Sequence, residues 1–183
     1  MNNADKTDGA LLYEPEKRSV TEMIDKTGLI IIVRGVPSEK LPQLAEALYD
    51  GGVRLLEVTF DACGKKTDAE TAADIETLVE NFKGRMYIGA GTVLTKGQVR
   101  LTKKAGGSFI ISPNIDKDVI TESRMCGLVS IPGAMTATEI NNAHNFGADY
   151  VKLFPVTNLG AGYVKAVKAP LGHVKMLAVG GIN

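Results

Sequence analysis

The residue whose type and setting most favour chemistry in this sequence is Lys152. It lies in the apolar stretch Asp149-Tyr-Val-Lys-Leu-Phe-Pro155. A lysine in a buried strand is costly, because an unpaired ammonium must give up its hydration or lose its proton. A neutral amine in an apolar pocket is also a nucleophile that can form a Schiff base with a carbonyl substrate. The stretch alone equally allows Lys152 to point into solvent from a strand edge, so its neighbours in the fold have to decide.

Around Lys152 the chain repeats one unit, in which a helix, a glycine, an apolar strand and a polar loop follow one another. Glycine after a helix suits the left-handed conformation that often ends helices. We expect strands at 29–33, 53–58, 86–89, 108–111, 128–131, 149–155 and 173–179. We expect helices at 15–27, 38–50, 68–82, 95–105, 116–126, 136–146 and 160–168. Capping boxes are expected at Thr95–Gln98 and Thr136–Glu139, and the Ser19–Glu22 spacing leaves the start of the first helix open.

Strict alternation of strands and helices predicts an α/β fold with a parallel sheet and helices outside it. The seven expected strands are one short of a closed (β/α)8 barrel. The sheet is therefore either open and doubly wound, or a TIM barrel that lacks its eighth strand and helix in this chain. The residues at the strand ends favour the incomplete barrel. We expect residues 1–13 to form a flexible N-terminal tail and residues 14–183 a single incomplete TIM-barrel domain.

Chemistry in parallel α/β folds collects where the strands end. The polar residues and glycines at the expected strand ends are Arg34, Glu57, Thr59, Thr92, Ser112, Asn114, Lys152, Gly180 and Gly181. Each has an ordinary structural explanation: Glu57 could pair with an arginine, Thr92 could cap a helix, and the glycine pair could form a turn. Together they indicate one reaction, in which the lysine condenses with a 2-oxo acid and the carboxylate moves protons. An arginine or a threonine would then hold the substrate carboxylate.

Alternation along the strand predicts the surroundings of Lys152. If Lys152 points into the barrel, Tyr150 and Phe154 do so too, while Val151 and Leu153 face the helices. The amine would then lie in a mainly apolar well, which lowers the pKa of a lysine.

Six motifs stand at these strand ends: Leu56-Glu-Val-Thr59, Gly89-Ala-Gly-Thr-Val93, Ile111-Ser-Pro113, Ile131-Pro-Gly133, Lys152-Leu-Phe-Pro155 and Gly180-Gly-Ile182. In type and order they resemble the motifs of the 2-keto-3-deoxy-6-phosphogluconate / 4-hydroxy-2-oxoglutarate aldolases. The resemblance extends from roughly Lys17 to the C-terminus. The combination of motifs is specific, although no single motif is.

The resemblance implies a (β/α)8 barrel and a class I aldolase that needs no metal or cofactor and is usually a homotrimer. By the same resemblance, Lys152 is the Schiff-base lysine and Glu57 the general acid and base. The implied substrate-binding residues are Arg34, Thr92, Pro113, Phe154, Gly180 and Gly181. Arginine would serve substrate anions, threonine the pyruvyl group, proline and phenylalanine the pocket wall, and the glycines a phosphate-binding loop.

The reaction that the resemblance implies is cleavage of a 2-keto-3-deoxy-6-phospho sugar acid or of 4-hydroxy-2-oxoglutarate. The products are pyruvate and an aldehyde, which is glyceraldehyde 3-phosphate or glyoxylate. Such a reaction belongs to carbohydrate metabolism of the Entner–Doudoroff type.

Three features depart from the family pattern. Asp61 stands where many members have an arginine that contacts the pyruvyl carboxylate, so Arg34 or backbone groups would have to hold it. Ala178-Val179 replaces a Pro-Thr pair before the glycines, which removes a hydroxyl near the substrate. The eighth strand, which carries a further phosphate contact in the family, is absent from the sequence.

Composition excludes several other classes. Acidic and basic residues balance at 21 each, which argues against nucleic acid or an anionic membrane surface as a partner. Cys63 and Cys126 are isolated, as are His144 and His173, so neither a disulfide scaffold nor a zinc site is expected. The N-terminus lacks the pattern of a signal peptide, and no apolar run is long enough for a membrane helix. We therefore expect a cytoplasmic protein whose substrate is a small 2-oxo acid.

Two other functions stay open at this point. A phosphate-binding barrel isomerase or epimerase would use the glycine pairs at the strand ends, but it has no need of Lys152 beside Phe154-Pro155. A truncated, inactive or partner-completed barrel would follow from unpaired edges on the first and last strands.

Overall fold

The computed structural model describes residues 8–157 and 159–181. Its helices are α1 (Asp8–Thr27), α2 (Leu41–Asp50), α3 (Asp68–Asn81), α4 (Lys96–Lys104), α5 (Lys117–Met125), α6 (Ala137–Asn145) and α7 (Gly160–Lys168), with a 3-10 turn at Ser38–Lys40. Its strands are β1 (Ile31–Val33), β2 (Leu55–Thr59), β3 (Tyr87–Gly91), β4 (Phe109–Ile111), β5 (Val129–Ile131), β6 (Gly133–Ala134), β7 (Val151–Leu153) and β8 (Met176–Ala178). Every expected helix and strand is present, and the strand pairs are parallel, as predicted.

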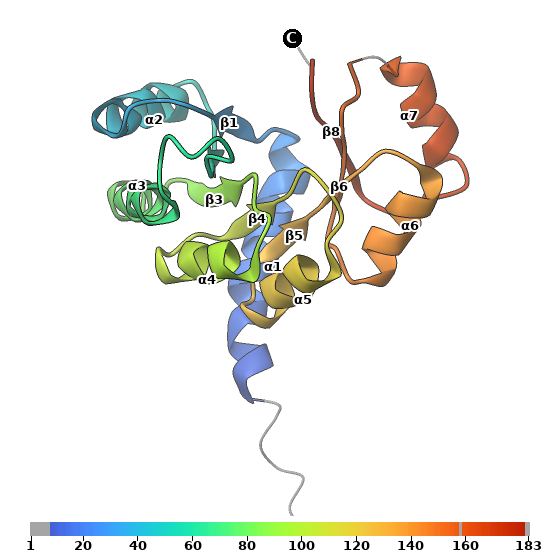
Figure 1. Cartoon of the computed structure of the whole chain (residues 1–183), viewed down its shortest axis with the longest axis horizontal. Helices are drawn as coiled ribbons and strands as arrows, with labels where there is room; N and C mark the ends of the chain where they lie inside the picture. Colours follow the sequence, from blue (N-terminus) through green and yellow to red (C-terminus); the bar gives the residue numbers. More distant parts are fainter. Residues whose placement is uncertain (1–7, 158, 182–183) are drawn as a thin grey trace, which may run out of the picture.

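The strands form one wall in chain order. A five-stranded sheet runs from β1 to β5, and a three-stranded sheet runs from β6 to β8. The chain joins the two sheets at Pro132, which has no N–H to donate but whose carbonyl accepts the N–H of Lys152 at 2.9 Å. The predicted strand at 128–131 therefore corresponds to β5, and the short β6 directly after the proline was not predicted. In Figure 1, α2 to α5 flank β1 to β5, and α6 and α7 flank β6 to β8, which is the layering of an α/β barrel.

Alternation along the strands divides the apolar core into an outer and an inner part. In β4, Ile110 packs in the outer cluster with Val58, Ile75 and Ile88. A second outer cluster joins β7 to α6 and α7. The flanking residues of β4 instead belong to the inner cluster, whose buried members are Val20, Ile24, Leu55, Phe109, Ile111, Val129, Ile131 and Tyr150. Two of these members come from α1, so α1 closes the end of the barrel at which the strands begin.

The first helix begins earlier than predicted. It starts at Asp8 rather than at Pro15, so residues 8–13 of the expected tail are helical; residues 1–7 lie outside the described residues. Proline favours the first turn of a helix, but the helix formers at 10–12 extend this one beyond it. The Ser19–Glu22 spacing therefore lies inside the helix, where Glu22 accepts a hydrogen bond from Arg18 at 2.9 Å.

The strand expected at 29–33 is shorter than predicted and is not buried on both faces. It spans Ile31–Val33, and the side chains of Leu29 and Ile32 are 49% and 42% exposed. Among the described residues β1 pairs with β2 alone, and β8 pairs with β7 alone. The apolar run therefore predicts a strand correctly. Its burial on both faces would need a second neighbouring strand, and among the described residues β1 has only β2.

Side chains cap the N-termini of α3, α4, α5 and α6. The predicted capping box at Thr136–Glu139 is present, and so is one at Thr67–Glu70 that was not predicted. At the start of α4 only half of the predicted box forms, because the Gln98 amide oxygen accepts the N–H of Leu94 at 2.8 Å.

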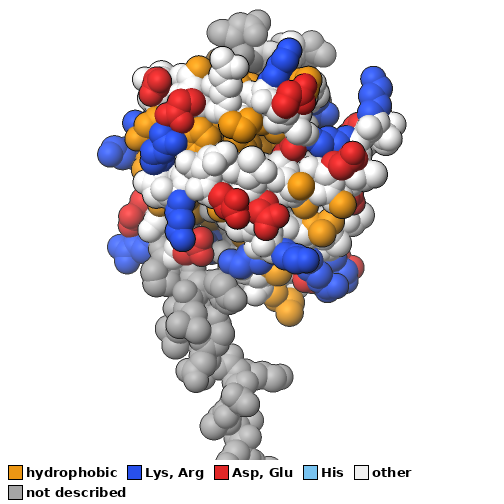
Figure 2. All heavy atoms as spheres, turned by 90° about the vertical axis from the view of Figure 1, so that its left-hand side faces the viewer, with side chains coloured by type: hydrophobic (Ala, Val, Ile, Leu, Met, Phe, Trp, Pro, Cys, Tyr) orange, Lys and Arg blue, Asp and Glu red, His pale blue; other side chains and the backbone are white. Residues whose placement is uncertain are grey.

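One face of the molecule carries charges of both signs. Figure 2 shows the face around α2 and α3, where Lys and Arg side chains are interspersed with Asp and Glu. In residues 8–157 and 159–181, no helix combines the length and the apolar character that a membrane span requires.

A polar network fastens α1 to the barrel. The Tyr150 hydroxyl lies 2.7 Å from an Asp25 carboxylate oxygen and 3.1 Å from the carbonyl oxygen of Thr21. Lys175 donates to the second Asp25 oxygen at 2.6 Å, and Lys17 pairs with Asp149 at 2.9 Å. Because Tyr150 is buried, its hydroxyl depends on these partners.

We expect the substitution Tyr150→Phe to lower the free energy of unfolding by about 1–2 kcal/mol, since a buried hydrogen-bonded hydroxyl is lost. Urea denaturation measures this loss. Tyr87→Phe is the matched control, because no hydrogen bond of the Tyr87 hydroxyl occurs within the described part of the chain. Equal losses in the two variants would contradict a stabilising role of the network.

Candidate active site

Lys152 lies in the middle of β7 and points into the barrel. Its neighbours Val151 and Leu153 pack in the cluster under α6 and α7, and Tyr150 packs in the inner cluster, as alternation predicts. The Lys152 side chain is 7% exposed, and its Nζ lies 4.6 Å from the centroid of the Phe154 ring. Burial lowers the pKa of this amine, with the Arg34 charge acting in the same direction and that of Glu57 against it. The geometry therefore excludes a solvent-facing lysine.

Glu57 lies in the middle of β2, which is buried along its whole length. Its side chain is 1% exposed, and its Oε2 has no hydrogen-bond partner among the described residues. Burial raises the pKa of Glu57 to about 7, against the opposing charges of Lys152 and Arg34. A carboxyl group with a pKa near neutrality can both take up and give back a proton.

Arg34 and Thr92 meet at the same rim from different strands. Arg34 follows β1 and donates from Nη2 to the Thr92 hydroxyl oxygen at 2.9 Å. The backbone of Thr92 has a φ of 56°, which is costly for a β-branched residue by about 1–2 kcal/mol. This conformation and the hydrogen bond together hold a hydroxyl and a guanidinium side by side, which is a donor pair suited to a carboxylate.

The Asp61 side chain binds the backbone of its own loop. Its carboxylate accepts the backbone N–H groups of Cys63 at 2.8 Å, Lys65 at 2.7 Å and Lys66 at 3.0 Å. These bonds, that of Cys63 first, hold the pKa of the Asp61 carboxyl below its usual value. The carboxylate therefore organises the loop after β2 and leaves the Arg34 guanidinium with Thr92.

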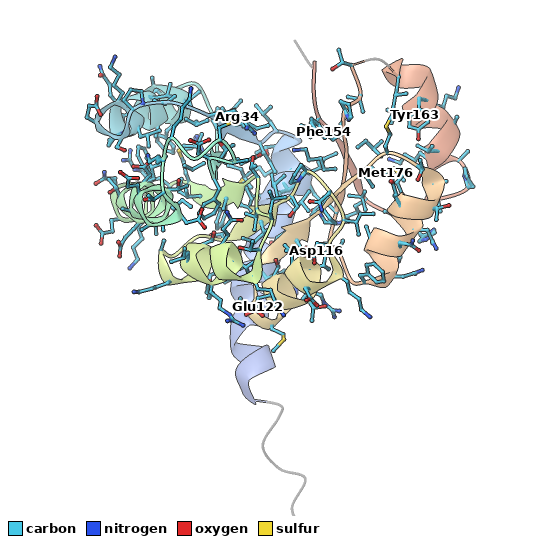
Figure 3. All side chains as sticks on the ribbon, in the orientation of Figure 1. Arg34, Asp116, Glu122, Phe154, Tyr163 and Met176 are labelled. Atoms are coloured by element: carbon cyan, nitrogen blue, oxygen red, sulfur yellow. The ribbon has the colours of Figure 1, made fainter. Side chains whose placement is uncertain are left out.

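The remaining predicted residues line cavities beside the mouth of the barrel. Phe154, which is 37% exposed, and Pro113 line a cavity of about 420 Å³ with Met135. Gly180 and Gly181 have positive φ angles of 94° and 68°, which favour glycine. Figure 3 shows Arg34 and Phe154 toward the same end of the molecule.

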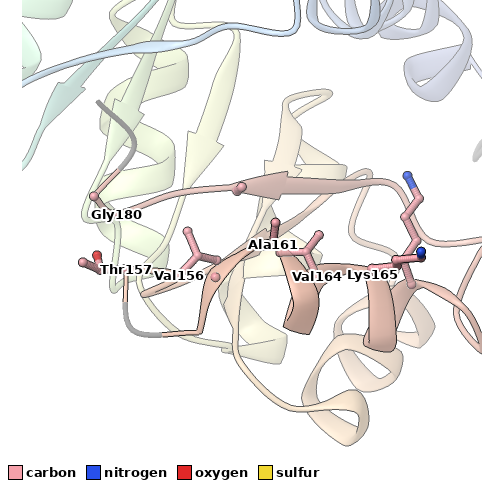
Figure 4. Close-up of a pocket in the computed structure, with 10 residues that line it drawn as sticks. Val156, Thr157, Ala161, Val164, Lys165 and Gly180 are labelled. Carbon is pink, nitrogen blue, oxygen red and sulfur yellow. The ribbon is translucent and has the colours of Figure 1, made fainter.

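The two glycines border a different cavity, of about 490 Å³, which lies against α7 (Figure 4). Its wall includes Thr157, Val164 and Lys165. A Cβ on Gly180 would lie 3.5 Å from the Phe154 ring, whose centroid is 4.6 Å from the Lys152 Nζ, so this ring is close to both. The structure thus brings Lys152, Glu57 and Arg34 within range of one another's charge, and the glycine pair lines a separate cavity.

Two features of the site were not predicted. A cavity of about 550 Å³ lies between the loops after β1 and β2, where Lys66 pairs with the buried Asp74 and donates to the Ser38 hydroxyl. The second feature is Gly91, because a Cβ at this position would overlap the Glu57 side chain. No spacing in the sequence marks either feature, because both depend on contacts between loops or strands.

Metal ligands are not clustered in the described part of the chain: no three His, Cys, Asp or Glu side chains there could hold one ion. His144 and His173 pack edge to face with their ring centroids 5.0 Å apart, and Cys63 and Cys126 are free.

The chain is similar to known proteins in both sequence and structure. The chain is 35% identical over 156 residues to a probable 2-dehydro-3-deoxy-6-phosphogalactonate aldolase of Rhizobium meliloti, covering 85% of this chain and 71% of that protein. A KDPG aldolase from Legionella pneumophila, solved with pyruvate captured at low pH as a covalent carbinolamine intermediate, is 31% identical with a TM-score of 0.74. The match covers 84% of this chain and 72% of that one.

A third match is a chain of a cube-shaped protein cage that was designed by fusing symmetric oligomeric domains. It is 32% identical with a TM-score of 0.77, covering 84% of this chain and 55% of that one. The family model described as KDPG and KHG aldolase matches residues 20–183. The chain therefore belongs to the KDPG and KHG aldolase family, whose barrel it shares.

Proposed function

We propose that this chain is a class I aldolase that cleaves a 2-keto-3-deoxy-6-phospho sugar acid, or 4-hydroxy-2-oxoglutarate, to pyruvate and an aldehyde. The observation that carries the proposal is the buried Lys152 amine, which shares the mouth of the barrel with a carboxyl group of raised pKa. Further support comes from the Legionella relative, which was captured with pyruvate covalently bound.

The first step is attack of the Lys152 amine on C2 of the 2-oxo acid. The lowered pKa of Lys152 increases the fraction of neutral amine, which is the nucleophilic form. Loss of water from the carbinolamine leaves a protonated imine. This imine accepts electrons in the next step, so the proposed reaction uses neither a metal nor a cofactor.

Glu57 then acts as the base and the acid. As a carboxylate it removes the proton of the C4 hydroxyl, directly or through a water molecule, and the C3–C4 bond breaks. The electron pair of that bond forms an enamine, while C4 leaves as glyceraldehyde 3-phosphate or glyoxylate. The same carboxyl group returns a proton to C3, and hydrolysis of the imine releases pyruvate and Lys152.

Arg34 and Thr92 are the proposed ligands of the substrate carboxylate. Support comes from their hydrogen bond and from the position of Asp61, which is bound to its own loop. Pro113 and Phe154 form the proposed wall around the pyruvyl group. Gly180 and Gly181 are proposed to bind the distal phosphate through their backbone N–H groups.

The assembly and the location are the last parts of the proposal. We propose a homotrimer in the cytoplasm, without nucleic acid or membrane as a partner. The relative in a cage built from symmetric oligomeric domains supports an oligomer in general. The balanced charge of the chain supports the lack of a polyanionic partner.

We expect pyruvate and borohydride to add one reduced pyruvate to wild-type protein and none to Lys152→Met, because only the wild type can form the imine. Intact-protein mass spectrometry measures the adduct. Lys83→Met, which removes an exposed lysine next to α3, is the control and should still be labelled. A wild type without any adduct would refute the proposed reaction and favour a barrel of this family that lacks aldolase activity.

We expect kcat/KM for cleavage to rise with pH through about 7, because the pKa of Glu57 is raised to about 7 and its carboxylate is the base. Deprotonation of the Lys152 ammonium group acts in the same direction, since the neutral amine is the nucleophile. In Glu57→Gln the rate of cleavage should be at least about 100-fold lower than in the wild type. Its pH profile should also lack the rise that titration of Glu57 causes. A pH profile that is the same in both proteins would contradict the role of Glu57.

We expect Arg34→Gln to raise the KM for the 2-oxo acid by roughly 10–100-fold, since one charge-assisted contact is lost. Arg54→Gln removes an arginine from the other end of β2 and should leave KM unchanged. Steady-state kinetics with both variants measure the difference. A normal KM in Arg34→Gln would assign the carboxylate to backbone groups instead.

A further inference from the structure

We propose that Gly91 is a positioning residue for Glu57: the missing side chain at Gly91 leaves the space in which the Glu57 carboxyl group lies. The inference rests on the proposed function of Glu57 as the proton-transferring group. Nothing in the reaction itself requires a glycine at this position, so the requirement comes from the packing of β2 against β3.

The contacts between the two residues are close. A Cβ on Gly91 would lie 1.6 Å from the Glu57 Oε1, 2.4 Å from its Cδ and 2.7 Å from its Cγ. All three distances are shorter than any real carbon contact, and all three involve Glu57. The φ of Gly91 lies outside the left-handed region, so space and not backbone conformation is what demands glycine here.

The strand register shows the direction in which Glu57 leans. Glu57 stands opposite Gly89, whereas Gly91 stands opposite Thr59. The carboxyl group therefore extends from its own level to the next inward level of β3, toward the end at which Arg34 and Thr92 meet. Without the gap at Gly91, the side chain would have to take another rotamer.

No hydrogen bond to Oε2 is available among the described residues to hold the carboxyl group in this place. Packing against Gly91 is therefore what confines it, and the same packing keeps it out of water, with 1% of the side chain exposed. A methyl group at residue 91 would push the carboxyl group away from β3. Displacements of about 1 Å can cost roughly 100-fold in rate, because proton transfer depends on geometry.

Gly89 offers a matched control on the same strand and the same face. A Cβ there would lie 2.3 Å from Cδ2 of the Phe109 ring, so it is crowded as well. Its three closest contacts are all with the ring of Phe109, a core side chain. Substitution of Gly89 therefore reports what crowding of β3 does by itself.

The experiment compares Gly91→Ala with Gly89→Ala. We expect Gly91→Ala to lower kcat about 100-fold and to shift the Glu57 limb of the pH profile, while borohydride still traps pyruvate on Lys152. In Gly89→Ala we expect a lower Tm, with kcat per folded molecule within about threefold of wild type. Equal effects of the two substitutions on kcat and on the pH profile would overturn the proposal.

A thermal-stability cycle tests the contact independently of activity. The decrease in Tm caused by Gly91→Ala should be smaller in a Glu57→Ala background, because the crowded carboxyl group is then gone. An undiminished decrease would overturn the proposal, even where Gly91→Ala alone folds poorly. Failure of pyruvate trapping in the wild type would instead refute the proposed function and leave this cycle interpretable.

Discussion

The site depends on one constraint, which is that the Lys152 amine and the Glu57 carboxyl group are both buried at the same end of the barrel. Removal of water disfavours the charged form of each group, so the pKa of Lys152 falls and that of Glu57 rises to about 7. The two values move toward each other, and each charge limits the shift of the other. The outcome is an amine that can attack a carbonyl and a carboxyl group that can exchange protons near neutral pH, which is what aldol chemistry needs.

The barrel supplies this burial through the alternation of its strands. Inward positions of β2, β4 and β5, together with Tyr150 just before β7, fill one end with large apolar side chains, which α1 covers through Val20 and Ile24. The polar inward positions follow toward the other end, at Glu57 and Lys152. Two glycines on β3, Gly89 and Gly91, leave the space that Phe109 and Glu57 occupy. Stability and reactivity are therefore separated along the barrel axis, as in other enzymes of this fold.

The loop after β2 is organised by the Asp61 carboxylate. A carboxylate at Asp61 cannot bind a substrate anion, but it can accept three N–H groups of its own loop. The loop is ordered by these bonds, and the Arg34 guanidinium remains hydrogen-bonded to Thr92. The cationic ligand that we propose at this rim is therefore Arg34, which directly follows β1. The positive φ of Thr92 costs conformational energy, which the surrounding contacts offset. Such strained residues are common at functional sites.

The sequence by itself determined the order of strands and helices and the rim at which the polar residues meet, whereas the inward direction of Lys152 was decided by the structure. The order of the elements and the rim follow from periodicity and from glycine placement, which are local properties of the chain. It did not determine the exposure of Ile32, the start of α1 or the half-formed cap at Gln98, since each depends on which neighbour is present. Only the tertiary structure revealed that the Asp61 carboxylate accepts N–H groups of its own loop. It also revealed that the Glu57 carboxyl group lies where a side chain at residue 91 would be. Strand register and the path of the loops decide which of these residues come into contact. Local sequence patterns specify neither of them.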